Sequence, residues 1–188
     1  MTDYNKKNYK IFLTANIISS FIAGIFGPFY ILFVQDKGGG LENFGIAMGL
    51  LLLAQSIVAY YAGKYSDIFG RKPLLILEGY GHAITVILFL FISQIWQLYV
   101  LQIISGILAG LEATAHTSFL GDITEKKSRG KDVGKYYMVV GTISALTMMA
   151  GGYVIAIVGL KIVFVLMAIA DIISTSMFWM LKENKNGK

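Results

Sequence analysis

The chain alternates between long, almost uninterrupted apolar runs and short polar segments. A helix needs about 20 mostly apolar residues to cross a lipid bilayer, and several runs reach that length. Because lipid offers the backbone no hydrogen-bond partners, we expect each of these runs to be a helix. The expected membrane helices lie at about residues 9–34, 41–62, 73–93, 96–120, 133–157 and 162–181.

The polar segments between these runs are too short to fold separately. Residues 1–188 are therefore predicted to form one all-α membrane domain, a bundle of six transmembrane helices. The first run is longer than the roughly 7–15 apolar residues of a signal peptide, so we predict no cleavable signal. Pro28 predicts a kink near the far end of the first helix.

Composition agrees with a membrane protein. Hydrophobic residues make up 56% of the chain and charged residues only 14%, against about 25% charged residues in soluble domains. The absence of cysteine excludes disulfides, thiolate metal sites and cysteine catalysis. The remaining residues contain no convincing phosphate-binding loop, metal-ligand cluster or nucleophile–base set. We therefore expect no enzyme activity, no metal and no cofactor.

The 16 lysine and arginine residues are distributed unevenly. All but Lys37 and Lys161 lie in the N-terminal segment, the second and fourth connections or the C-terminal tail. Cytoplasmic segments of membrane proteins carry the excess of basic residues, so both termini are predicted to be cytoplasmic. The net charge of +5 is then a topology signal rather than a nucleic-acid site, and a bacterial cell membrane is the expected location.

The connection between the second and third runs contains a recognisable motif. It reads Gly63-Lys64-Tyr65-Ser66-Asp67-Ile68-Phe69-Gly70-Arg71-Lys72-Pro73. This resembles the signature loop of the major facilitator superfamily, with Tyr65 where a leucine is usual. The matching positions are Gly63, Ser66, Asp67, Gly70, Arg71 and Lys72. The alternative interpretation is an ordinary basic loop.

Two weaker motifs point to the same family. Asp122, Arg129-Gly130 and Gly134 resemble its connection into the fifth helix, and residues 159–164 resemble a Gly-Trp-Arg-x-x-Phe turn. The resemblance implies a charge network at the cytoplasmic ends of the helices that holds the outward-facing state. Its expected charged members are Asp67 and Arg71 of the signature loop together with Asp122 and Arg129. Gly63 and Gly70 belong to the same loop, where they allow a tight turn.

Family members usually have twelve helices in two six-helix halves, with the substrate site between them. This chain corresponds to one half. The number of spans is even and the bias of basic residues toward one side is strong, so every copy should insert in the same orientation. We therefore expect a homodimer in which a second copy takes the place of the other half. A truncation or gene fragment would also explain the length.

The resemblance implies that the second and fifth helices would meet the partner copy. Small residues permit close approach of membrane helices, either to a partner or within one protomer. On these two helices they are Gly45, Gly49, Gly134, Gly141, Ser144, Gly151 and Gly152.

Acidic residues inside apolar runs cost at least about 2.5 kcal/mol each, so they are functional candidates. Glu112 lies on one face of the fourth helix with Gln102, Ser105 and His116, at steps of three and four residues. The resemblance implies that the first and fourth helices line the cavity, and Asn16 suits its wall. Gln102 occupies the position of a family arginine tied to proton coupling.

We hypothesise that Glu112, paired with His116 one turn away, carries a proton or binds a cationic substrate. The alternative is a structural ion pair or a helix–helix hydrogen bond. Asp171, a second acid in the sixth helix, is expected to turn inward to a partner such as Asn16 or Gln55.

The predicted function is secondary active transport of a small solute by a homodimer that alternates its access. Proton-coupled export, with the protein as an antiporter, is the preferred form. The competing hypothesis is a non-transporting membrane fragment, or an interaction subunit that pairs with another six-helix half. The expected partners are the small-molecule substrate, the bilayer and a second copy, but no nucleic acid.

Overall fold

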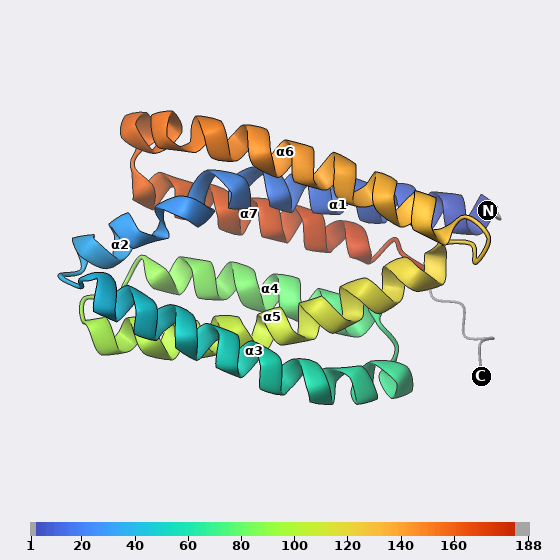
Figure 1. The fold of residues 1–188 in the computed structure, drawn as a ribbon, viewed down its shortest axis with the longest axis horizontal. Helices are drawn as coiled ribbons and strands as arrows, with labels where there is room; N and C mark the ends of the chain where they lie inside the picture. The colour runs from blue at the N-terminus through green and yellow to red at the C-terminus, as the bar shows by residue number, and fades with distance from the viewer. Residues whose placement is uncertain (1–2, 183–188) are drawn as a thin grey trace.

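The structure, a computed structural model, describes residues 3–182 and all of their side chains except those of Asp3, Tyr4, Pro28 and Asp67. Within this part of the chain all regular elements are helices, and six of them are long and apolar enough to cross a membrane. They run side by side along the long axis of the molecule (Figure 1). The prediction of an all-α bundle with six membrane spans is therefore confirmed.

The first span is α1 (Asp3–Phe26), which a 3-10 turn, η1 (Gly27–Phe29), joins to the short α2 (Tyr30–Asp36). Pro28 lies in this turn, where its missing N–H breaks the helical ladder. The other spans are α3 (Leu41–Phe69), α4 (Lys72–Phe89), α5 (Ile95–Ile123), α6 (Arg129–Val158) and α7 (Leu160–Phe178).

Several helices extend beyond the apolar runs that predict them. The helix α3 continues to Phe69 rather than residue 62, and α6 begins at Arg129 rather than residue 133. Hydropathy marks the part of a helix that lies in lipid, whereas backbone hydrogen bonds continue into the polar segments beyond it. Gly70 and Gly159, with φ of +93° and +78°, end α3 and α6 in a conformation that favours glycine.

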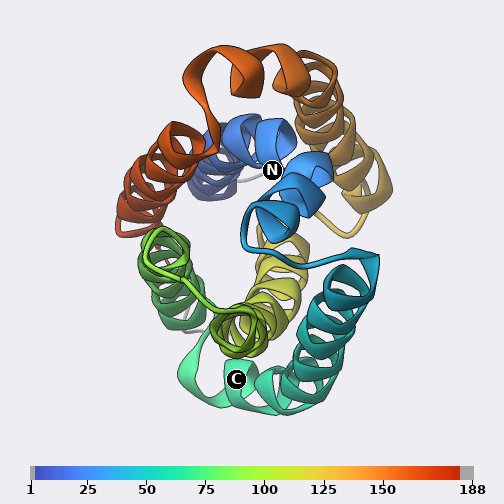
Figure 2. The same ribbon diagram turned by 90° about the vertical axis from the view of Figure 1, so that its left-hand side faces the viewer.

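The helices form a curved row when viewed end-on (Figure 2). In this row α3 packs on α5, α5 on α4, α4 on α7, α7 on α1, and α1 on α6. The helices at its two ends expose most of their surface. In the apolar stretch of α3 that could span a membrane, only 6% of the residues are buried, and in that of α6 only 11% are buried. The corresponding share in the other spans is 33–44%.

Glycines let the helices of this row approach closely. A Cβ atom on Gly110 of α5 would lie 2.7 Å from the Gln55 carbonyl oxygen of α3. A Cβ atom on Gly151 of α6 would lie 2.6 Å from the Ile25 carbonyl oxygen of α1. Close backbone approach of this kind is the usual way in which membrane helices pack.

Two apolar clusters close the bundle near its ends. One surrounds Phe33, Phe89 and Phe164, and the other surrounds Phe12 and Phe119. The second cluster lies at the end where Asn8 donates a hydrogen bond of 2.8 Å to the Lys182 carbonyl oxygen. Polar side chains are concentrated between the two clusters, at the middle of the helices.

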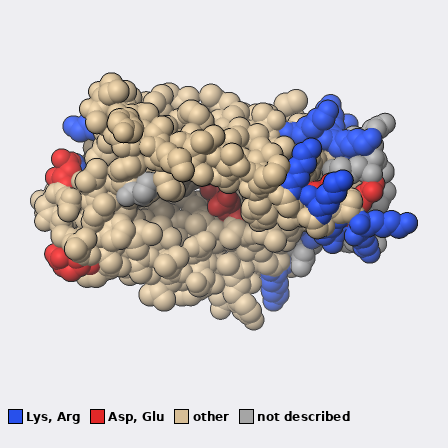
Figure 3. Space-filling model, turned by 45° about the horizontal axis from the view of Figure 1, so that its top comes forward, with Lys and Arg blue, Asp and Glu red and all other residues tan. Residues whose placement is uncertain are grey.

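The beginning and the end of the described chain lie at the same end of the bundle (Figure 1). Most of the lysine and arginine side chains visible in Figure 3 gather at this end as well. The middle of the molecule presents an almost uncharged belt, interrupted by a hollow with acidic atoms at its bottom (Figure 3).

Candidate functional site: a polar pocket at mid-bundle

A pocket of about 330 Å³ lies between the two apolar clusters, with walls from α1, α3, α4, α5 and α7. Its polar lining residues are Asn16, Ser19, Ser20, Glu78, His82, Ser105, Glu112, His116, Asp171, Ser174 and Thr175. So many polar groups at membrane depth are costly unless they bind one another, water or a solute.

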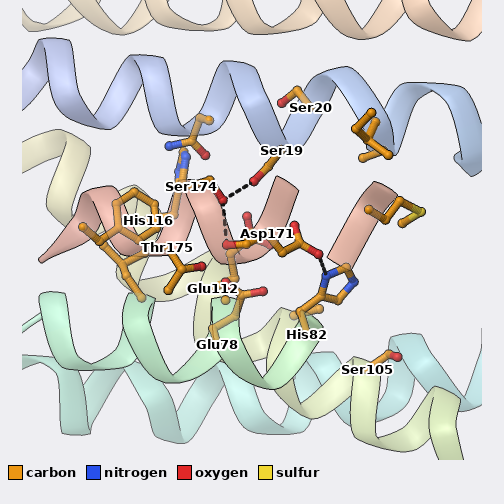
Figure 4. A pocket seen from close by; sticks show the side chains of 18 of the residues that line it. Ser19, Ser20, Glu78, His82, Ser105, Glu112, His116, Asp171, Ser174 and Thr175 are labelled. Atoms are coloured by element: carbon orange, nitrogen blue, oxygen red, sulfur yellow. Dashed lines mark hydrogen bonds and ion pairs between the residues drawn. The ribbon is translucent and has the colours of Figure 1, made fainter. Parts of the chain in front are cut away.

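Three carboxylates from three helices converge on this pocket (Figure 4). Glu78 comes from α4, Glu112 from α5 and Asp171 from α7. Glu112 has the most exposed side chain of the three and reaches into the open space of the pocket. All three acids lie within electrostatic range of one another and of His82. The pocket lining thus holds three carboxyl groups and two imidazoles, those of His82 and His116, so acidic side chains outnumber basic ones.

Asp171 is paired with His82. A hydrogen bond of 2.8 Å joins His82 Nδ1 to Asp171 Oδ2, and the Asp171 side chain is only 14% exposed. The expected partners of Asp171, Asn16 or Gln55, are therefore wrong. The pair forms because Gly79 of α4 lies directly against Thr175 of α7, which brings the two helices close.

His116 lines the pocket but turns toward α6 rather than toward Glu112. Its Nε2 atom lies 2.7 Å from the Tyr136 hydroxyl, and its ring packs on Phe12 at 4.8 Å between centroids. Among the described residues no hydrogen bond or ion pair joins His116 to Glu112. Their spacing places both side chains on one face of α5, but it does not decide which neighbouring helix each side chain meets.

Of the remaining predicted cavity residues, two line the pocket and one does not. Asn16 and Ser105 line the pocket, as proposed from the sequence. Gln102 does not line it: Gln102 is 4% exposed and lies beside Tyr30, which belongs to the apolar cluster around Phe33, Phe89 and Phe164. The polar face of α5 is therefore shorter than its spacing suggests, because aromatic side chains fill the bundle beyond Ser105.

The signature loop brings two predicted network residues together. Arg71 Nε lies 3.2 Å from Asp122 Oδ2, which links the start of α4 to the end of α5. Arg71 Nη1 also donates to the Ser66 carbonyl oxygen, at 3.5 Å.

The structure describes three of the other predicted residues of the signature loop and the charge network. Gly63 lies in α3, where an added Cβ atom would meet only Thr114, at 3.6 Å. Gly70 has the positive φ described above. Arg129 begins α6 and is exposed. The side chain of Asp67 lies outside the described residues.

Sequence reasoning missed several pocket residues on α1 and α7. Ser174 and Thr175 follow Asp171 by three and four residues, so the helical spacing that marked α5 also marks this face of α7. His82 follows Glu78 by four residues, a spacing that allows a pair on one helix, whereas the structure pairs His82 with Asp171 across helices. Within residues 3–182 no group of three or more His, Asp or Glu side chains is arranged to hold a metal ion.

An apolar helical bundle with a charged, solute-sized pocket at its centre defines the class of polytopic membrane proteins that handle solutes within the bilayer. Comparison with known families agrees with this class. The family model of the Major Facilitator Superfamily matches residues 12–188, so the chain belongs to this family of membrane transporters, which are not enzymes.

Three relatives illustrate the range of this similarity. The uncharacterised MFS-type transporter YitZ of Bacillus subtilis is 26% identical over 144 residues, which cover 77% of this chain and 88% of YitZ. The multidrug resistance efflux pump PmrA of Streptococcus pneumoniae is 27% identical over 173 residues, 88% of this chain and 43% of the pump. The class B tetracycline resistance protein of Escherichia coli is 38% identical over 93 residues, 50% of this chain and 23% of that protein. The chain thus spans less than half the length of the two resistance proteins.

Proposed function

We propose that this protein is a secondary transporter that exports a small cationic solute in exchange for protons. The observation that carries the proposal is the position of Glu112, an acid that reaches into the open space of a mid-membrane pocket with two further carboxylates nearby. Relatives described as multidrug efflux pumps and tetracycline resistance proteins support export as the direction.

The charge balance of the pocket supports coupling. His82 is held by Asp171, and His116 is hydrogen-bonded to Tyr136. Glu78 and Glu112 are therefore neighbouring acids of the pocket lining whose nearby imidazoles have other partners. Two ionised carboxylates at this depth repel each other, so a proton or a cationic ligand stabilises the site. A proton and a cation that compete for one acid produce exchange when the pocket opens to each side in turn.

A homodimer supplies the second half of the transport path in this proposal. Gly45, Gly49, Gly134 and Gly141 lie on α3 and α6, and a Cβ atom on any of them would meet nothing within 4 Å. Gly24 and Gly151, in contrast, already pack α1 against α6 inside the protomer. The open glycines and the low burial of α3 and α6 support docking of a second copy on these two helices. A relative of similar extent, YitZ, supports the half-length arrangement.

The orientation belongs to the same proposal. The basic end of the bundle, where the described chain begins and ends, faces the cytoplasm of a bacterial cell membrane. The Arg71–Asp122 pair lies at this end, where it stabilises the closed cytoplasmic side in the outward-facing state. Breakage of the pair accompanies the opposite state, so the two access states alternate.

Transport by purified protein in liposomes tests this function. A pH gradient is expected to drive tetraphenylphosphonium flux, and Glu112→Gln is expected to reduce that flux at least tenfold because the amide cannot carry a proton. Glu42→Gln is the matched control, since Glu42 lies in the first turn of α3, outside the pocket.

Wild-type flux from Glu112→Gln with unchanged pH dependence would contradict the role of Glu112. A wild-type protein that carries no flux and associates with a different six-helix membrane protein would instead support the interaction-subunit alternative.

A further inference from the structure

A second cavity lies on the outer surface of the bundle, in the seam between α1 and α7. Its volume is about 370 Å³ and every residue that lines it is apolar. The lining residues are Ile17, Ile18, Phe21, Ile22, Leu166, Ile169, Ala170 and Ile173. In a bilayer, an apolar groove on the outer surface of two membrane helices would face the lipid chains.

This groove and the polar pocket lie on adjacent faces of α1 and α7 and share one lining residue, Ile22. On α1, Ile18 lines the groove and its neighbour Ser19 lines the pocket. On α7, Ala170 lines the groove and its neighbour Asp171 lines the pocket. Ile22 lines both cavities and is therefore a shared wall.

Two kinds of contact close this wall. Ser19 donates a hydrogen bond of 2.7 Å to Ser174, which itself donates to the Asp171 carbonyl oxygen at 3.0 Å (Figure 4). Ile22 has only apolar atoms to contribute, so a change of its rotamer breaks no hydrogen bond. Rotamer changes of this kind are fast compared with helix movement.

We propose that this seam is a side window through which an amphipathic amine enters the pocket directly from the bilayer. The ammonium group would pass Ile22 and bind beside Asp171 and Glu112, while the apolar tail would occupy the groove. The proposal deepens the function proposed above, on which its transport step rests, by assigning the substrate to membrane-partitioned cations rather than to hydrophilic ones.

Charge complementarity favours an amine over a phospholipid as the occupant that crosses the window. Glu78, Glu112 and Asp171 face the inner side of the wall, and they would repel the phosphate of a lipid headgroup. An amine carries the opposite charge, and its tail matches the apolar lining of the groove. A lipid acyl chain can fill the groove, but its headgroup gains nothing in the pocket.

Cysteine labelling tests the window without the need for transport. The chain contains no cysteine, so Ala23→Cys places a single thiol in the pocket. A bilayer-partitioned reagent, dodecyl maleimide, is compared with a water-soluble one, trimethylammonium-ethyl methanethiosulfonate, on protein in liposomes. We expect Ile22→Trp to slow the maleimide reaction at least tenfold and Ile22→Ala to accelerate it. Neither variant should change the water-soluble reaction more than twofold.

Ile84→Trp is the matched control, because Ile84 is 62% exposed on α4 and lines neither cavity. Equal maleimide rates with Ile22 intact, with Ile22→Trp and with Ile22→Ala would overturn the window. The window would also be overturned if Ile84→Trp slowed the maleimide reaction as much as Ile22→Trp does. If Ile22→Trp also slows the water-soluble reagent, the maleimide rate of Ile22→Ala decides. A faster maleimide reaction of Ile22→Ala supports the window, and an unchanged one overturns it. Absence of tetraphenylphosphonium flux in the wild-type protein would overturn the proposed function while leaving a positive labelling result intact.

Discussion

At the scale of single residues, the pocket shows how a membrane protein retains charge within lipid. Each ionised group at the bilayer centre costs at least about 2.5 kcal/mol on insertion scales. The protein offsets part of this cost for Asp171 by pairing it with His82. Glu112 instead reaches the open space of the pocket, where water, a proton or a ligand can meet it.

The paired acid predicts a stability effect that differs from the effect at Glu112. Asp171→Leu would leave the half-buried His82 without its acceptor, and an unsatisfied buried polar group costs about 1–3 kcal/mol. Asp171→Asn preserves an acceptor and should cost less. We expect the midpoint of thermal unfolding in detergent to fall for Asp171→Leu, to fall less for Asp171→Asn and to stay near wild type for Glu112→Gln. An unchanged midpoint for Asp171→Leu would show that the pair does not stabilise the fold.

At the scale of helices, the same residue type serves two different purposes. Gly24 of α1 lies directly against Thr147 of α6, and a Cβ atom there would also approach the Ser144 carbonyl oxygen to 2.8 Å. Gly45 of α3 has open space beside it. One glycine therefore packs helices within the protomer, and the other leaves a helix surface available to a partner.

This contrast predicts that a glycine-to-valine substitution has different effects at Gly24 and at Gly45. Gly24→Val should overpack the α1–α6 contact and lower the free energy of unfolding by about 1–3 kcal/mol. Gly45→Val should leave the stability of the separated protomer within about 0.5 kcal/mol, while it weakens self-association. Thermal unfolding at low protein concentration in detergent measures the first effect, and light scattering at high concentration measures the second. Equal destabilisation by both variants would rule out an open face at Gly45.

At the scale of the whole molecule, the curved row of helices leaves α3 and α6 at its ends with most of their surface exposed. Their exposed side chains include Leu53 of α3 and Leu146 of α6, at 64% and 61%. The start of α3 and the end of α6 lie at the same end of the bundle. Leu53 and Leu146 are each twelve residues from that end (53 − 41 and 158 − 146), so they lie at similar depth in the membrane.

The proposed homodimer predicts a specific cross-link between these two positions. Leu53→Cys and Leu146→Cys proteins with different affinity tags, co-reconstituted in liposomes, should be joined by a short bifunctional maleimide into a product that carries both tags. Ile84→Cys, on the exposed face of α4, should not cross-link to either protein above background. A mixed product no more abundant than this control would contradict docking through α3 and α6.

The sequence alone was sufficient for the number of membrane helices, their class and the concentration of basic residues at one end. These features depend on the solvent: lipid requires about 20 apolar residues for each span, whatever the neighbouring helix. The sequence also identified Glu112 and Ser105 as residues of one polar face, because helical spacing places side chains on a face before any packing is known. Asn16, on the first helix, was expected in the cavity wall from the family resemblance.

Only the tertiary structure decided which groups meet across helices. The spacing along α5 suggested that Glu112 would pair with His116, and the spacing along α4 would equally allow Glu78 to pair with His82. In the structure, His82 is hydrogen-bonded to Asp171 and His116 to Tyr136. Periodicity assigns a direction around a helix axis but no distance to the next helix. That distance is set by close contacts such as Gly79 against Thr175. The packing of α1 on α7 likewise decided that one side chain, Ile22, lines both the polar pocket and the apolar groove.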